Sequence, residues 1–116
     1  MTDKIVVFST CASEEEAEKL ARLVVEQGLA ACASIVPNVR SYYRWQGAVE
    51  TAGECLLVIK SARGQFAALS AALERAHSYE VPEVLAVPVV AGSAPYLAWL
   101  DANIGGEKSE NEDVPQ

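Results

Sequence analysis

The sequence predicts an α+β fold with an antiparallel sheet, in the order strand, helix, strand, strand, helix, strand, helix. Two long runs rich in β-branched and aromatic residues flank a single tight turn at Gln46-Gly47. Two stretches repeat apolar residues at helical spacing, one before these runs and one after them. Short apolar runs near both ends of the pattern indicate further strands of the same sheet.

The first strand and helix follow from residues 5–28. Ile5-Val-Val-Phe8 is a short apolar run, typical of a central strand that is buried on both faces. Ser13-Glu-Glu-Glu16 has the pattern of a capping box, in which Ser13 accepts a hydrogen bond from the Glu16 amide and Glu16 accepts one from the Ser13 amide. Gly28 supplies the left-handed residue that ends the helix.

The stretch from Leu29 to Lys60 predicts one β-hairpin with unusually long arms. Gly47 allows the tight reversal that sets Trp45 opposite Ala48, and Pro37 predicts a bulge or an edge because it cannot donate a ladder hydrogen bond. Each arm is about twice the usual strand length of 5–6 residues. The distal aromatic residues need cover from their own domain or from another subunit, and we favour the second: they are Tyr42, Tyr43 and Trp45.

The rest of the chain completes a ferredoxin-like βαββαβ order with one added C-terminal helix. A helix opens at Gly64 and must end before Pro82. The apolar run 84–90 contains Pro88, which predicts an edge strand or a bulge. Ser93 caps the last helix, which has Pro95 in its first turn. We expect residues 1–104 to form a single domain and residues 105–116 to be a disordered acidic tail.

Two helices can cover only one face of such a sheet. The other face is left without a helix, except for cover from the short last one. Together with the overlong hairpin, an uncovered apolar face predicts a closed oligomer. The expected members of this face are Phe8 or Val7, Ile35, Val58 and Val87.

Composition narrows the class of function. The formal net charge of −7 opposes nonspecific binding to nucleic acid, because phosphate contacts need an excess of Lys and Arg. No apolar run approaches the ~20 residues of a membrane-spanning helix, and the amino terminus lacks the features of a signal peptide. The three cysteines show no C-x-x-C spacing, which argues against a disulfide framework. We therefore expect a cytosolic protein without nucleic-acid or membrane partners.

Few residues suggest chemistry by themselves. His77 is the only histidine, and a single His near a helix end is more often a capping or surface residue than a ligand. Cys11, Cys32 and Cys55 are soft ligands that folding could bring beside it to bind a copper-like ion, but their spacing does not show this. The chain has no phosphate loop, no nucleophile elbow and no H-E-x-x-H motif.

Several adjoining motifs resemble those of the CutA proteins, the divalent-cation tolerance family. The resemblance runs from about Ile5 to Ile104 and implies a ferredoxin-like subunit that forms a cytosolic, non-enzymatic homotrimer linked to tolerance of copper and other divalent cations. The fold also resembles that of PII-type signalling trimers, which implies sensing of a small ligand in clefts between subunits. The motifs are Leu29-Ala-Ala-Cys-Ala33, Tyr43-Arg-Trp-Gln-Gly47 with Glu50, His77-Ser-Tyr-Glu-Val-Pro-Glu-Val84 with Pro88, and Tyr96-Leu-Ala-Trp-Leu100.

The copper site that the resemblance implies is incomplete here. In the family it uses a Cys at the end of the first strand and two adjacent His at the end of the second helix. This chain has Ser9 at the strand position, with Cys11 two residues later, and Ala76 and His77 at the helix positions. The resemblance therefore leaves His77 and Cys11 as the candidate metal ligands, for copper or another divalent cation.

Two alternatives come from other classes of function. The βαββαβ order is also that of an RNA-recognition module, but this needs several aromatic residues on the central strands and a basic sheet, whereas the charge is negative. The other alternative is a small enzyme, or a PII-like sensor, with its site in a cleft between subunits. The candidate residues for that cleft are Trp45, Tyr79, Glu80 and Glu83.

Overall fold

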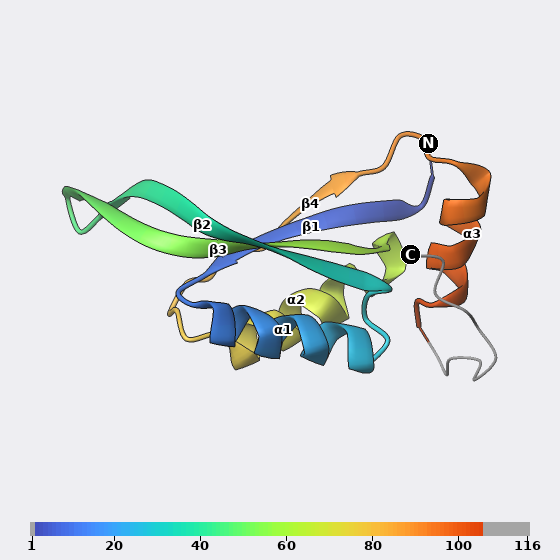
Figure 1. Cartoon of the computed structure of the whole chain (residues 1–116), viewed down its shortest axis with the longest axis horizontal. Coiled ribbons are helices and arrows are strands. Elements are labelled where there is room, and N and C mark those ends of the chain that lie inside the picture. The colour runs from blue at the N-terminus through green and yellow to red at the C-terminus, as the bar shows by residue number, and fades with distance from the viewer. Residues whose placement is uncertain (1, 106–116) are drawn as a thin grey trace.

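The computed structural model describes residues 2–105 and shows a four-stranded antiparallel sheet in the order β2-β3-β1-β4 (Figure 1). This confirms the predicted fold class and element order. Of the predicted tail, residues 106–116 lie outside the described residues. No helix in the described range has the length and apolar character needed to cross a membrane. The elements are β1 (Lys4–Cys11), α1 (Glu14–Glu26), β2 (Cys32–Trp45), β3 (Ala48–Ala62), a 3-10 turn (Arg63–Gln65), α2 (Phe66–Ala76), β4 (Leu85–Pro88) and α3 (Ala94–Ala102).

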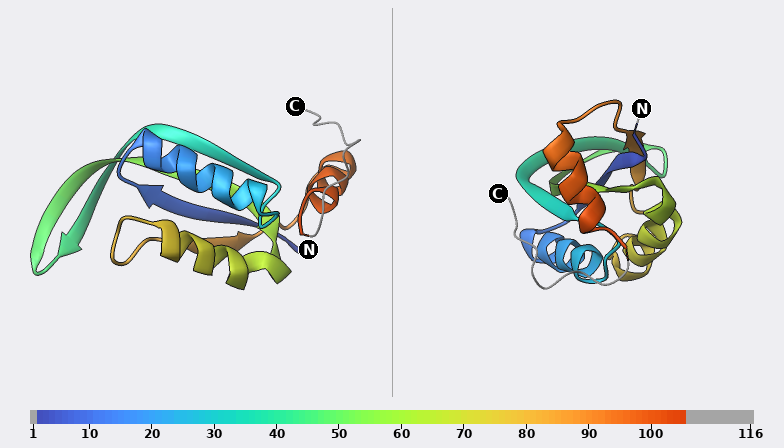
Figure 2. Two further views of the ribbon diagram at one scale, coloured as in Figure 1. Left: turned by 90° about the horizontal axis from the view of Figure 1, so that it is seen from below. Right: turned by 90° about the vertical axis from the view of Figure 1, so that its right-hand side faces the viewer.

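The core lies between one face of the sheet and the helices α1 and α2, which lie side by side on that face (Figure 2). Burial alternates along β1, as expected of a strand covered on one side. The prediction that residues 5–8 are buried on both faces is therefore wrong for the single chain, because no helix covers Val6 and Phe8. The largest fully buried apolar side chains of the core are Leu20, Leu57, Ile59, Leu69, Leu73, Val7 and Val24.

The opposite side of the sheet, which we call the open face, carries partly exposed apolar residues. Phe8, Val58 and Val87 lie on it as predicted, whereas Val7 and Ile35 face the helices instead. The third helix, α3, stands at the end of the sheet away from the hairpin tip and does not cover this face (Figures 1 and 2). The apolar members of the open face are Val6, Phe8, Val36, Leu56, Val58, Leu85 and Val87.

The distal hairpin, residues 39–54, extends beyond β1 as a two-stranded ribbon (Figure 1). It begins at a bulge, where the register shifts between Val36 and Val39 and Asn38 has φ of 63°. It ends in a two-residue turn in which Gln46 and Gly47 have φ of 50° and 85°, the signs of a type I′ turn. The predicted bulge and the pairing of Trp45 with Ala48 are both confirmed.

Candidate functional site

A cleft of about 590 Å³ lies where the ribbon leaves the sheet. Its volume is within the range of roughly 300–1,000 Å³ that is usual for small-molecule sites. One wall is the ribbon, and the other is the loop between α2 and β4 (77–84). We call it the aromatic cleft, and it is lined by Thr10, Ser41, Tyr42, Tyr43, Trp45, Glu54, Tyr79, Glu80, Val81 and Glu83.

The ribbon wall follows from the alternation of side chains along a strand. Ser41, Tyr43 and Trp45 are spaced two residues apart, so their side chains project from the same side of β2. All three line the aromatic cleft. In the single chain Tyr43 and Trp45 are 43 % and 45 % exposed, so part of their aromatic surface faces the solvent-filled cleft.

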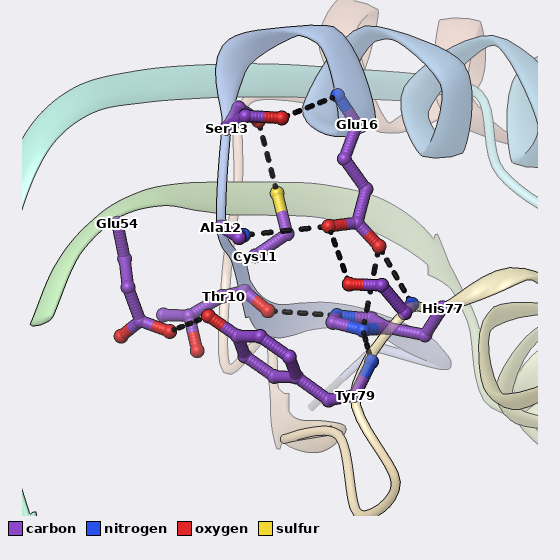
Figure 3. Close-up of polar contacts among 9 residues, drawn as sticks. Thr10, Cys11, Ala12, Ser13, Glu16, Glu54, His77 and Tyr79 are labelled. Atoms are coloured by element: carbon purple, nitrogen blue, oxygen red, sulfur yellow. Dashed lines mark hydrogen bonds and ion pairs between the residues drawn. The ribbon is translucent and has the colours of Figure 1, made fainter.

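A hydrogen bond ties the two walls together. The Tyr79 hydroxyl donates to Oε2 of Glu54 at 2.6 Å (Figure 3). Glu54 lies on β3 opposite Val39, directly after the bulge, and is buried. Burial raises the pKa of Tyr79, and the neighbouring Glu54 carboxylate raises this pKa further, so the phenol keeps its proton and remains a donor.

His77 joins the start of the loop to β1. The Tyr79 amide donates to Nδ1 of His77 at 3.1 Å, so Nδ1 carries no proton. Nε2 therefore carries it and donates to the Thr10 carbonyl at 2.8 Å. The His77 side chain is fully buried, and its ring lies 4.7 Å from the ring of Tyr79 (Figure 3). His77 thus holds Tyr79, which lines the loop side of the cleft, in a fixed position relative to β1.

Glu16 of α1 holds the same loop through Ser78. Its carboxylate accepts the Ser78 amide at 2.7 Å and the Ser78 hydroxyl at 2.9 Å. Burial by itself would raise the pKa of Glu16, but the Ser78 donors and the Ala12 amide outweigh burial and keep this pKa below its ordinary value. The capping box is half formed: Ser13 accepts from the Glu16 amide at 3.1 Å, but the Glu16 carboxylate bonds Ala12 and Ser78 instead of the Ser13 amide.

The bond between the walls gives a first prediction. Tyr79→Phe is expected to lower the free energy of unfolding by about 1–2 kcal/mol, because a buried carboxylate loses a donor. Urea unfolding at fixed subunit concentration measures it. Tyr42→Phe is the matched control, since Tyr42 is 69 % exposed in the single chain and its hydroxyl is not the donor that joins the two walls, and it should leave the midpoint unchanged. Equal midpoints for Tyr79→Phe and the wild type would contradict a stabilising bond.

The candidate metal ligands, Cys11 and His77, have other partners. Burial, helped by the charge of Glu16, raises the pKa of the Cys11 thiol to about 11, so it holds its proton at neutral pH, whereas the thiolate is the form that binds metals. Backbone groups use both ring nitrogens of His77. Within residues 2–105 no three His, Cys, Asp or Glu side chains form a group that could hold a metal ion. These residues therefore do not fit a copper ion in this conformation, and copper binding by them stays a prediction.

The four residues predicted for a ligand cleft, Trp45, Tyr79, Glu80 and Glu83, all line the aromatic cleft. Their role in binding stays a prediction. Thr10 and Glu54 also line the cleft, and the sequence did not predict them there. Alternation along β3 could have placed Glu54 on the same side of the hairpin as Tyr43 and Trp45, but no local pattern pairs it with Tyr79. Glu16 was missed as a support of the loop because its spacing from Ser13 indicated a local cap.

Comparisons with known proteins agree over nearly the whole described chain. A family model, CutA1 divalent ion tolerance protein, matches residues 5–103. The divalent-cation tolerance protein CutA of Thermus thermophilus is 44 % identical over 100 residues, which are 86 % of this chain and 97 % of that protein. Protein CutA of Homo sapiens is 43 % identical over 93 residues, which are 80 % of this chain and 52 % of the human protein. The chain thus spans about half the length of the human relative.

Solved structures show the same fold. The divalent cation tolerance protein from Thermus thermophilus matches with a TM-score of 0.86 at 43 % identity, over 88 % of this chain and 99 % of that one. CutA from Xylella fastidiosa matches with a TM-score of 0.87 at 38 % identity, over 90 % of this chain and 100 % of that one.

Proposed function

Because the chain belongs to the CutA1 divalent ion tolerance protein family, we propose that it is a trimeric, non-enzymatic protein that binds a small ligand in the aromatic cleft. The observation that carries the proposal is the construction of the cleft. Exposed aromatic faces form one wall, and the other wall is a loop without regular secondary structure that hydrogen bonds from His77, Ser78 and Tyr79 nevertheless hold in place. Such preorganisation lowers the cost of ordering a site on binding.

The chemistry of the lining favours binding over catalysis. The described residues that line the cleft offer hydroxyls, carboxylates and aromatic rings, but no Cys, His or Lys. The best-placed hydroxyl, that of Tyr79, keeps its proton because of burial and the adjacent Glu54 carboxylate. These groups do not form the activated nucleophile and base that covalent catalysis requires. We therefore assign the cleft a binding role.

Assembly into a homotrimer is the second part of the proposal. The open face and the ribbon expose large apolar side chains, among them Val36 at 43 %, Val87 at 44 % and Val49 at 65 %. The outer edge of β2 is also unpaired within the described chain over 14 residues. Long edges and apolar faces are covered in stable proteins, and a head-to-tail contact that closes after three copies would cover both.

The link to divalent cations comes to this chain through its family. Since Cys11 and His77 do not fit a copper ion as they are held here, we assign ligand binding to the aromatic cleft. We also propose a cytosolic location. The names of relatives vary in this respect, with a chloroplastic CutA in Arabidopsis thaliana and a periplasmic one in Archaeoglobus fulgidus.

Tryptophan fluorescence tests the ligand site directly. The chain has two tryptophans, so Trp99→Phe leaves Trp45 as the only reporter, and Trp45→Phe is the matched variant that removes it from the cleft. A screen of small molecules at millimolar concentration should yield compounds that raise the melting temperature and change the emission of the Trp99→Phe protein. The same compounds should affect Trp45→Phe less. If every stabilising compound leaves Trp45 emission unchanged, the ligand site is elsewhere.

A further inference from the structure

We propose, on the basis of the proposed ligand site, that the aromatic cleft selects organic cations, in which ammonium groups are attached to an apolar carbon chain. Three properties of the cleft favour this class of ligand. These are the sign of the charge on its lining, the aromatic surface beside this charge, and the spread of the carboxylates along its walls.

The charged residues of the lining all have the same sign. Glu54, Glu80 and Glu83 line the cleft, and no Lys, Arg or His is among the described lining residues. The formal net charge of the whole chain, −7, has the same sign. A cleft with walls of one charge concentrates ligands of the opposite charge and excludes anions. Phosphates, nucleotides and carboxylates are therefore poor candidates, and cations are good ones.

The aromatic residues discriminate between kinds of cation. Tyr43 and Trp45 present partly exposed rings on the ribbon, and Tyr79 lines the same cleft from the loop. Ammonium groups are attracted to the faces of such rings, and Trp is the strongest of them. Methylene groups of the same ligand gain by covering the remaining ring surface. A strongly hydrated metal ion gains little from these rings.

The arrangement of the carboxylates also disfavours a metal ion. A Ca²⁺ ion needs about six to eight oxygen ligands within roughly 2.6 Å, but no group of three acidic or other metal-binding side chains occurs among residues 2–105. One Glu54 oxygen is already an acceptor for Tyr79 at 2.6 Å, while Glu80 and Glu83 lie on the opposite wall. A ligand that carries several ammonium groups along one chain can use separated carboxylates, which a single ion cannot.

The test uses four probes on the Trp99→Phe protein at constant ionic strength. Spermidine is the organic cation, octane-1,8-diol is its uncharged counterpart, octanedioate is its anionic counterpart, and Mg²⁺ is an inorganic cation. Spermidine should change Trp45 emission and raise the melting temperature, and the other three should do neither. Glu80→Gln with Glu83→Gln should weaken spermidine about five- to tenfold. Glu15→Gln with Glu18→Gln removes the same charge from the exposed side of α1 and should leave affinity unchanged.

The outcomes separate this inference from the proposed function. If octanediol or octanedioate binds at Trp45 and spermidine does not, the cleft is a ligand site but the cation preference is wrong. Equal effects of Mg²⁺ and spermidine, or equal losses in the two double variants, would likewise overturn the preference. A third outcome is that no small molecule changes Trp45 emission and that acrylamide does not quench it. A second copy of the chain would then fill the cleft, and the proposed function and this inference would both fail.

Discussion

Glu16→Gln is expected to lower the free energy of unfolding by about 2 kcal/mol, because hydrogen bonds to a charged acceptor contribute roughly 1.5–3 kcal/mol. The Glu16 side chain is only 14 % exposed and its carboxylate accepts two hydrogen bonds from Ser78. Glutamine fills the same space, but it has only one acceptor oxygen. Its NH₂ group would take the place of the second oxygen and would face one of the Ser78 donors. Glu15→Gln, on the exposed first turn of the same helix, is the matched control and should cost less than about 0.5 kcal/mol.

The pH dependence of this difference identifies its cause. The hydrogen bonds from Ser78 and Ala12 outweigh burial and keep the pKa of Glu16 below its unfolded value. A carboxyl with a lowered pKa contributes stability that is present above the unfolded pKa of about 4.3 and is lost as pH falls through the folded pKa. The difference in the free energy of unfolding between wild type and Glu16→Gln should therefore be largest at pH 7 and decrease below about pH 4.3. An equal difference at both ends of this range would show that packing, rather than charge, is responsible.

Val58→Lys is expected to convert the proposed trimer into monomers. Val58 lies in the middle of the open face, between Phe8 on β1 and Ser34 on β2. In a single chain it is partly exposed, so a lysine could extend its ammonium into water. In an assembly that covers this face, each subunit would bury an unpaired charge at a cost of several kcal/mol. Light scattering should then report the mass of one 12.4 kDa chain.

Two variants control for effects unrelated to assembly. Val58→Thr keeps the shape of the side chain without a charge and should remain assembled. Ala68→Lys adds the same charge at an exposed position of α2 and should also remain assembled. If Val58→Lys keeps the wild-type mass while it is folded, the open face is not part of the interface.

Local signals predicted much of the fold, and register was the part that they missed. The Gln46-Gly47 turn and the bulge after Val36 both follow from the chemistry of single residues. Ile35 was nevertheless assigned to the wrong face. Counting back from the pair Trp45 and Ala48 without the extra residue sets Ile35 opposite Val58 on the open face. The bulge shifts it opposite Leu57, on the helix side.

The candidate site shows the same division between local and distant information. Trp45 and the Tyr79–Glu83 segment could be selected from the sequence, and the fold brings them to one cleft. The bonds that fix the cleft join residues far apart in the chain, and no spacing predicts such bonds. Glu16 reaches Ser78 across 62 positions, and Tyr79 reaches Glu54 across 25. Ser78 offers the Glu16 carboxylate two hydrogen-bond donors, whereas the predicted capping box would offer it only the Ser13 amide.

Native mass spectrometry of the wild-type chain is the most direct test of a trimeric ligand-binding protein, because it counts subunits and bound molecules in the same ion. We expect a species of three 12.4 kDa chains that takes up as many as three molecules of a compound that stabilises the protein against heat. A single 12.4 kDa chain at micromolar concentration, or three chains that retain none of the stabilising compounds, would contradict the proposed function.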